Sequence, residues 1–329
     1  MAEINAFLTG LYARSESLSK ATQDHDRGRV SAEQLTQQRQ SDQDQLVELQ
    51  KSAHLTYLSD GLLNWQDLFR PFLEIVQGLE AGPLVRFFDN NTFYRQPVVA
   101  APLHLRRENL ETWLSQYFQT NARGAWKASL PSPYFFAQVA HDTAYRDKPK
   151  LIEAFTEIVL TPIAEQLAAR GVKFLQLQEP WLVTCNSVDA APADWRALEK
   201  AIGTLGKNIK KKNLVLGLHT YFGDAAPALG PLLELDIDAV GIDFCETDLE
   251  NLRSFDFAEK ELICGCLDAR NSWVEDEAII VKFVERVQET LAPRVLSLST
   301  NADLEFVPEP VARRKVQLLG RVAAQFSSK

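Results

Sequence analysis

The stretch LVLGLHTYFGD, residues 214–224, joins a short apolar run to a polar end. Its first half reads as a strand, and its second half brings His219 and Tyr221 before a Gly-Asp turn. A continuous apolar run of this length is typical of a strand that is covered on both faces of a parallel sheet. His219 therefore stands at a strand end, where it is a candidate metal ligand, substrate contact or hydrogen-bonding core residue.

The same pattern recurs through the second half of the chain. Helix-like segments separate strand-length apolar runs, and each run finishes in polar residues on its C-terminal side. Polar side chains at the C-terminal strand ends line the site of a (β/α)8 barrel. We therefore predict a single (β/α)8 TIM barrel that spans residues 1–329. A doubly wound sheet would give similar strand ends, but no G-x-G-x-x-G motif follows an early strand. The apolar runs cover residues 172–180, 213–222, 237–244, 261–268 and 294–301.

The first half of the chain is less regular. Residues 7–16 and 54–61 are predicted to form the first two barrel strands, and the polar, Gln-rich segment 15–54 is predicted to be helical. Residues 83–106 are rich in β-forming residues around an Asp-Asn-Asn core. We predict that they form an extended loop or hairpin inserted over the barrel mouth.

Composition narrows the classes of partner. The net charge of −9 argues against nucleic acid, because a nucleic-acid surface needs clustered Lys and Arg. A small-molecule ligand, including an anionic one in a local basic pocket, remains compatible with this charge. No apolar run has the length of a membrane span, and no signal peptide is evident, so we predict no membrane partner. Four irregularly spaced cysteines favour reduced thiols and a cytoplasmic location.

Five short stretches together resemble the cobalamin-independent methionine synthase family. FFDNNTFYRQP (87–97) is similar to the W-F-D-T-N-Y-H-Y-x-x-P segment of the family's N-terminal barrel, and DGLLNWQD (60–67) to its G-D-F-x-W-Y-D. HTYFGD (219–224), VGIDF (240–244) and CLDARNSWVED (266–276) resemble later segments in the same order. The resemblance extends from about Leu8 to about Leu319.

The resemblance implies a function. Family members have two barrels. The C-terminal barrel binds zinc and homocysteine, while the N-terminal barrel lacks zinc and helps to bind the polyglutamate tail of 5-methyltetrahydrofolate. This chain is one barrel long and is closer to the N-terminal one. We therefore expect methyl transfer from a folate-type or other methyl donor to homocysteine or a related thiol, with a separate zinc-bearing barrel as partner.

Two other functions remain open, as does the question of whether the chain is an enzyme by itself. One is a binding or structural subunit without chemistry of its own. The other is a divergent, metal-independent enzyme on a small anionic substrate, with His219, Glu179 and Asp243 as its acid and base groups.

The resemblance also predicts the metal content. The family supplies a His-x-Cys pair, a glutamate and a second cysteine to zinc. These positions fall on His219, Tyr221, Asp243 and Ala302, so His219 is the only family zinc ligand retained. Since His and Asp alone are too few for a zinc site, we predict no zinc cofactor.

Cys264 and Cys266 leave one alternative open. Because they are two residues apart in a predicted strand, they point to the same face. A metal site that they build with His219 and Asp243 is geometrically conceivable. We favour the interpretation that they are small apolar core residues.

Further candidates fall near the predicted mouth. The homocysteine contacts of the family are replaced by Leu11, Leu62 and Gln178, which removes charged partners for an amino-acid ligand. The cations Arg14, Lys20 and Arg86 are candidate contacts for a polyglutamate-type tail. Turn formation would explain the polar cluster at residues 89–94 equally well, and core packing would explain Trp65 equally well. For residues 268–273 we favour a structural role, in which Arg270 pairs with Asp268 or Asp243. The predicted substrate-binding and ligand-binding residues are Trp65, Asp67, Asp89, Asn90, Asn91, Tyr94, Tyr221, Asp268, Arg270, Asn271 and Trp273.

Overall fold

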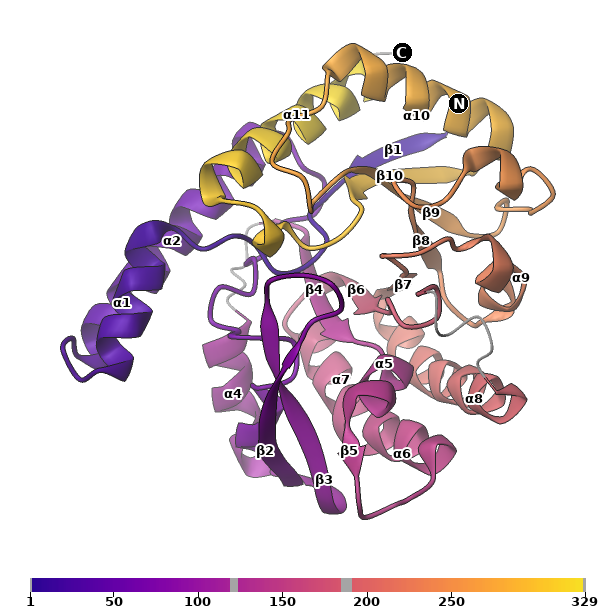
Figure 1. Ribbon diagram of the computed structural model, residues 1–329. Helices are drawn as coiled ribbons and strands as arrows, with labels where there is room; N and C mark the ends of the chain where they lie inside the picture. Colours follow the sequence, from indigo (N-terminus) through magenta and orange to yellow (C-terminus); the bar gives the residue numbers. More distant parts are fainter. Residues whose placement is uncertain (1, 119–123, 185–190, 328–329) are drawn as a thin grey trace.

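Seven parallel strands form one curled sheet in the computed structural model, which describes residues 2–118, 124–184 and 191–327 (Figure 1). The strand order is β1-β10-β9-β8-β7-β6-β4. All five apolar runs predicted in the second half contain one of these strands, which confirms that part of the prediction. The strands are β1 (Glu3–Ala6), β4 (Trp126–Pro131), β6 (Val172–Gln178), β7 (Val215–His219), β8 (Ala239–Asp243), β9 (Glu261–Leu267) and β10 (Val295–Thr300).

The second predicted barrel strand, at residues 54–61, does not form an extended strand of the sheet. Residues 55–58 lie between the two sheet edges: Thr56 N donates to Ala6 O and Leu58 N donates to Ala125 O, both at 2.8 Å. Within the described ranges, the segment forms a single isolated bridge, between Leu58 and Trp126. The described fold is therefore a curled parallel half-barrel with helices, and a complete eight-stranded barrel is not confirmed.

Two other predictions about strands need correction. β1 ends at Ala6, just before the predicted strand at residues 7–16, where the chain has already turned into a loop. β4 was not predicted, because its sequence WKASLP contains a lysine and lacks the apolar run of a buried strand. Its side chains are all buried nevertheless.

Helices cover the outside of the sheet. The predicted helical segment forms α1 (Glu16–Asp26) and α2 (Ala32–Ser52), and Ser31 and Gln34 cap the start of α2 reciprocally. These two helices form an arm that projects from the body of the molecule (Figure 1). The other helices are α3 (Phe72–Ile75), α4 (Leu110–Tyr117), α5 (Pro133–Val139), α6 (Lys148–Ala154), α7 (Thr161–Ala169), α8 (Pro192–Ile209), α9 (Ala226–Glu234), α10 (Glu277–Leu291) and α11 (Glu309–Ser327).

The inserted hairpin is confirmed. β2 (Val76–Arg86) pairs with β3 (Phe93–Leu105) in antiparallel fashion, so the hairpin begins earlier than the predicted residues 83–106. The short strand β5 (His141–Asp142) joins β3 on its other side. The hairpin tip, residues 87–92, carries the Asp-Asn-Asn sequence. None of the helices in the described part of the chain combines the length and apolarity needed to cross a membrane.

Candidate functional site

Polar side chains gather at the C-terminal ends of the strands, the region called here the mouth. Strands β6, β7, β8 and β10 each contribute residues at or just beyond their ends. Every one of these side chains is at most 2% exposed, so the mouth is a buried polar cluster. The mouth residues are Gln178, Glu179, His219, Tyr221, Asp243, Asn301 and Asp303.

A glycine makes room for the histidine. An added Cβ at Gly241 would lie 2.6 Å from the His219 ring, a distance that real Cβ atoms do not reach. Gly217, two residues before His219, likewise leaves room for the Phe174 ring. The space inside the sheet is thus set by small residues on strands that otherwise carry large apolar ones.

The His219 imidazole is neutral at ordinary pH. Burial and, to a smaller extent, the positive charge of Lys127 lower the pKa of His219 to about 3. Its Nδ1 lies 3.2 Å from Gln176 Nε2, while its Nε2 has no hydrogen-bond partner among the described residues. His219 therefore has one free ring nitrogen and no neighbouring carboxylate in hydrogen-bond contact.

Glu179 holds the chain at the end of β6. Its carboxylate accepts from the Ser132 hydroxyl and from the backbone N–H groups of Phe135, Trp181 and Leu182. Burial raises the pKa of Glu179 to about 7, and these four hydrogen bonds act in the opposite direction. Both oxygens are occupied by the protein's own donors, which supports the structural alternative for this residue over a role as acid or base.

Asp243 has a similar role at the end of β8. It accepts from the backbone N–H groups of Phe222 and Cys245, at 3.0 and 2.9 Å, and from the side-chain amide of Asn301. Burial raises the pKa of Asp243 to about 6 against these hydrogen bonds. The contact with Phe222 stabilises a residue with a φ of +71°, in the left-handed region that bulky side chains avoid.

A second hydrogen-bonded chain was not predicted. The Tyr221 hydroxyl donates to Gln178 Oε1 at 2.7 Å, and Gln178 Nε2 donates to Asp303 at 3.2 Å. Deeper inside, Lys127 of β4 donates to Thr9 O and to the Ser129 hydroxyl. Burial lowers the pKa of Lys127 to about 7 and raises that of Asp303 to about 7. The sequence signal that could have indicated this buried network is the lysine in WKASLP, residues 126–131.

The hairpin tip lies over the mouth. Asp89 forms an ion pair with Arg270 at 2.6 Å, and the Arg270 guanidinium also lies over the Phe222 ring. Phe88 contacts Phe222 with ring centroids 5.5 Å apart. The suggested partners of Arg270 were Asp268 or Asp243. Its actual partner is Asp89, because the hairpin brings that residue across from a distant part of the chain.

Other predicted residues of the hairpin region are engaged by the protein itself. Trp65 is fully buried among aromatic rings, and its Nε1 donates to a backbone carbonyl. Asp67 accepts from three backbone N–H groups, and Tyr94 is buried against Phe69. Asn90 is buried in the tip, where its side-chain amide donates to a backbone carbonyl. These contacts favour the interpretation that the four residues serve packing and turn formation over the interpretation that they bind a ligand.

The loop after β9 is more exposed. Asp268 and Asn271 each accept a backbone N–H two residues further on, as in hydrogen-bonded turns. Trp273 is 75% exposed and lies away from the buried mouth cluster. The loop therefore presents an aromatic side chain to solvent.

The three cations suggested for an anionic tail differ in their environments. Arg14 donates to Trp65 O, and Arg86 donates to backbone carbonyls and to Asn91 within the hairpin tip. Lys20 is exposed on α1. Arg14 and Arg86 therefore already donate to groups of the protein, whereas the Lys20 side chain lies in solvent.

The residues present do not fit a zinc ion. No group of three or more His, Cys, Asp or Glu side chains in the described ranges could hold a metal. Cys264 packs in the outer core, whereas its neighbour Ile263 points inside the sheet with Phe7 and Ala239. Because side chains alternate along a strand, Cys264 and Cys266 face away from His219. The alternative site that combines them is therefore ruled out by strand geometry.

Comparison with known proteins agrees with the fold. The profile of the family described as "Cobalamin-independent synthase, N-terminal domain" matches residues 74–292. The B12-independent methionine synthase of Shewanella sp. W3-18-1 superposes with a TM-score of 0.72 at 18% identity, over 98% of this chain and 97% of that one. A putative vitamin-B12 independent methionine synthase of Listeria monocytogenes gives 0.71 at 20% identity, over 99% and 98%.

Relatives of two sizes match in sequence. The 5-methyltetrahydropteroyltriglutamate–homocysteine methyltransferase of Lactococcus lactis is 23% identical over 264 residues, 79% of this chain but 33% of that protein. The methionine synthase of Saccharolobus solfataricus is 21% identical over 310 residues, 93% of this chain and 90% of that one. The chain thus spans a third of the first relative and nearly all of the second.

Fold and mouth together define an α/β protein with a curled parallel sheet and buried polar groups at its C-terminal strand ends. The chain belongs to the cobalamin-independent methionine synthase family, through the family's N-terminal domain.

Proposed function

We propose that the chain binds a folate-type or other methyl donor and takes part in methylating homocysteine or a related thiol. The thiol would be activated on a separate zinc-bearing barrel. We further propose that residues 1–329 form one barrel domain. Residues 55–58 would take the place of its second strand in chain order, which completes a set of eight. Family membership supports the methyl-transfer class, and the chemistry of the mouth supports the division of labour.

The observation that carries the proposal is the state of the four family zinc positions. His219 keeps a free Nε2, but the Tyr221 hydroxyl is bonded to Gln178, and Asp243 accepts from three groups of the protein. Ala302 has no ligand atom. A thiol is a poor nucleophile until it becomes a thiolate. Among the described residues the mouth holds no metal site, and its one free base, His219 Nε2, is too weak to deprotonate a thiol because its pKa is lowered to about 3. We therefore assign the activation step to a partner.

Ligand binding gives the first test. A ligand that binds only the folded state raises the melting temperature. We expect 5-methyltetrahydrofolate with a polyglutamate tail to raise it, and homocysteine alone to leave it unchanged. If homocysteine raises it and the folate does not, the chain is an acceptor-binding barrel and the proposal fails.

A non-catalytic subunit is the second candidate. It is favoured by the hydrogen-bonding of Glu179 and Asp243, whose oxygens are all taken up by the protein's own donors. If neither folates nor thiols raise the melting temperature, and the chain still binds a zinc-bearing barrel, this second function replaces the first.

A further inference from the structure

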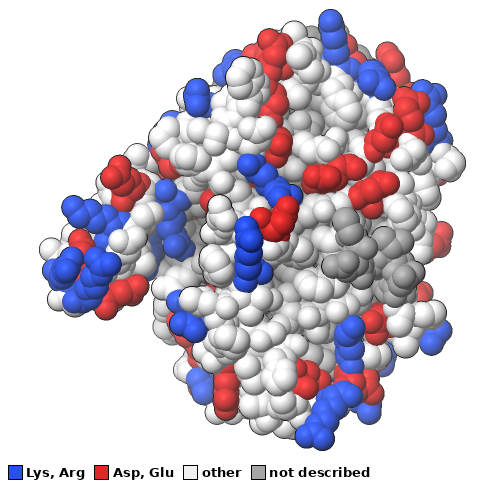
Figure 2. All heavy atoms as spheres, in the orientation of Figure 1, with Lys and Arg blue, Asp and Glu red and all other residues white. Residues whose placement is uncertain are grey.

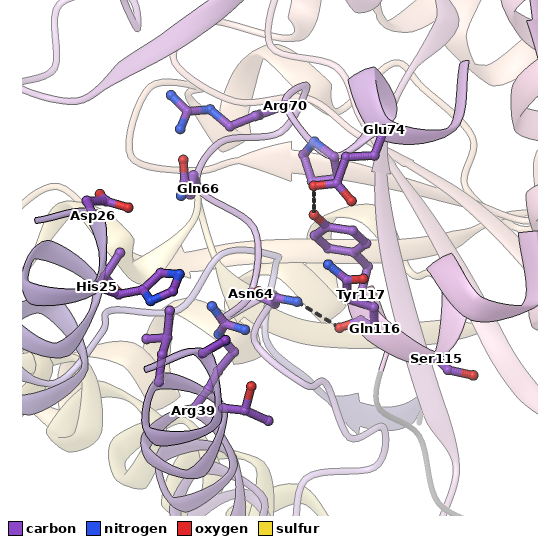
Figure 3. A pocket seen from close by; sticks show the side chains of 15 residues that line it. His25, Asp26, Arg39, Asn64, Gln66, Arg70, Glu74, Ser115, Gln116 and Tyr117 are labelled. Carbon is purple, nitrogen blue, oxygen red and sulfur yellow. Dashed lines mark hydrogen bonds between the residues drawn. The ribbon is translucent and has the colours of Figure 1, made fainter. Parts of the chain in front are cut away.

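A separate cavity lies between the α1–α2 arm and the segment that leads into α3. It has a volume of about 620 Å³, which is within the usual range for small-molecule sites. Arg39 of α2 enters it from one side, and Gln66 and Arg70 lie on the opposite wall, with Tyr117 of α4 at the base (Figure 3). None of the mouth residues lines this cavity, called here the arm pocket.

The two arginines of the arm pocket lack full partners. Arg39 forms no ion pair within 4.0 Å in the described structure, and its buried Nε has no hydrogen-bond partner there. The Nε of Arg70 is also unsatisfied, since its nearest carboxylate oxygen, on Asp67, is 3.7 Å away. Both oxygens of Asp67 already accept backbone N–H groups.

The carboxylates at the pocket do not compensate for this charge. Glu74 accepts from the Tyr117 hydroxyl at 2.5 Å, and Asp26 lies exposed at the end of α1. Burial lowers the pKa of Arg39, and the nearby positive charge of Arg14 adds to that effect. A partly desolvated guanidinium without a partner costs free energy, and such groups call for an explanation.

The charges on the arm around the pocket are mixed. Acidic and basic side chains both lie on the face of the projecting arm seen in Figure 2, and residues 16–52 hold seven Asp or Glu against five Lys or Arg. The attraction for an anion therefore comes from the two arginines that line the pocket itself. Guanidinium groups bind planar carboxylates and phosphates through paired N–H donors, which matches two arginines on facing walls.

We propose that the arm pocket binds a small organic molecule through a carboxylate or phosphate group, whose oxygens accept from Arg39 and Arg70. The side-chain amide of Gln66, on the same wall as Arg70, would donate to the same group. Bound there, the molecule would link the arm to the body. This site does not depend on the proposed methyl-transfer function, since the two share no residue.

Isothermal titration of the full chain with citrate and with inorganic phosphate, each at constant ionic strength, tests the proposal. We expect at least one of the two anions to bind. The anion that binds more tightly identifies whether the pocket prefers a carboxylate or a phosphate group. Arg39→Gln and Arg70→Gln should each weaken binding about ten- to hundredfold, as for lost charged hydrogen bonds. Arg29→Gln removes an exposed arm arginine outside the pocket and should leave the affinity unchanged.

Three results would overturn the proposal: no binding of either anion at millimolar concentration, unaltered binding by Arg39→Gln, or an equal loss in Arg29→Gln. The unliganded Arg39→Gln variant should melt at the wild-type temperature, because no partner is lost. If that variant fails to fold, modification of wild-type arginines by phenylglyoxal decides instead. The anion should then protect Arg39 but not Arg29, and equal modification of Arg39 with and without anion contradicts the proposal.

Discussion

The mouth and the arm pocket use buried polar groups in opposite ways. At the mouth, Glu179 and Asp243 are surrounded by donors from the protein, which offset part of the desolvation cost of each carboxylate, although burial still raises the pKa of both groups. In the arm pocket, the Nε atoms of Arg39 and Arg70 have no hydrogen-bond partner among the described residues, although Arg70 lies 3.7 Å from a carboxylate oxygen of Asp67. A cluster of catalytic residue types can therefore be structural, and an unremarkable helix arginine can point to a ligand.

The largest expected effect is on stability at the mouth. Asp243→Ala would leave two backbone N–H groups and the Asn301 amide buried without an acceptor. We expect the free energy of unfolding to fall by about 3 kcal/mol or more, measured by urea denaturation. The matched control is Asp89→Ala, which removes an exposed carboxylate and should cost less than about 1 kcal/mol. Equal losses in both variants would erase the contrast between buried and exposed acids.

The pH dependence of the free energy of unfolding should reveal the raised pKa of Glu179. Its pKa is raised by burial from its usual value to about 7, so the folded state binds more protons than the unfolded state between about pH 4.5 and pH 7. Its contribution to stability is therefore present in acid and is lost as the pH rises to 7. Relative to wild type, Glu179→Gln should gain stability over this range. A constant difference between the two proteins would contradict the pKa shift.

A smaller effect is expected at the hairpin tip. Arg270→Met removes the ion pair with Asp89, which should cost less than about 1 kcal/mol of overall stability. Hydrogen exchange of the tip amides, such as Asn90 N–H, should nevertheless become faster. Arg253→Met, which breaks an exposed pair with Glu250, serves as control and should leave tip exchange unchanged. Unchanged exchange in Arg270→Met would mean that aromatic packing alone holds the tip.

The smallest expected effect is at the arm pocket without ligand. Arg39→Gln removes a guanidinium that has no partner, so the free energy of unfolding should change by no more than about 0.5 kcal/mol. Urea denaturation in the absence of multivalent anions measures it. A loss comparable with that of Asp243→Ala would show that Arg39 is a structural residue after all.

Much of the fold followed from the sequence, because apolar strand runs and their polar ends are local signals. Residues 213–222 and 237–244 carry both, and β7 and β8 lie within them. Residues 54–61 were predicted to be a full strand, but a single bridge joins them to the rest of the described chain. Whether such a segment pairs along its whole length depends on the distance between two sheet edges that are far apart in sequence.

The site was less predictable than the fold. The type of residue identified His219 and Glu179, but their partners come from other strands and loops. The sequence could not reveal that Asp303 accepts a hydrogen bond from Gln178, or that Asp89 forms an ion pair with Arg270 across the mouth. Arg39 gave no signal at all, because a lone arginine on a polar helix is ordinary until the opposite wall is known.

Methionine formation by the purified chain tests the central claim most directly. The assay contains homocysteine, zinc and 5-methyltetrahydrofolate polyglutamate, and is run with the chain alone and with a zinc-bearing methionine synthase barrel. We predict no methionine above background from the chain alone, and faster formation with both proteins than with the zinc-bearing barrel by itself. Turnover by the chain alone, with one zinc bound per chain, would contradict the account.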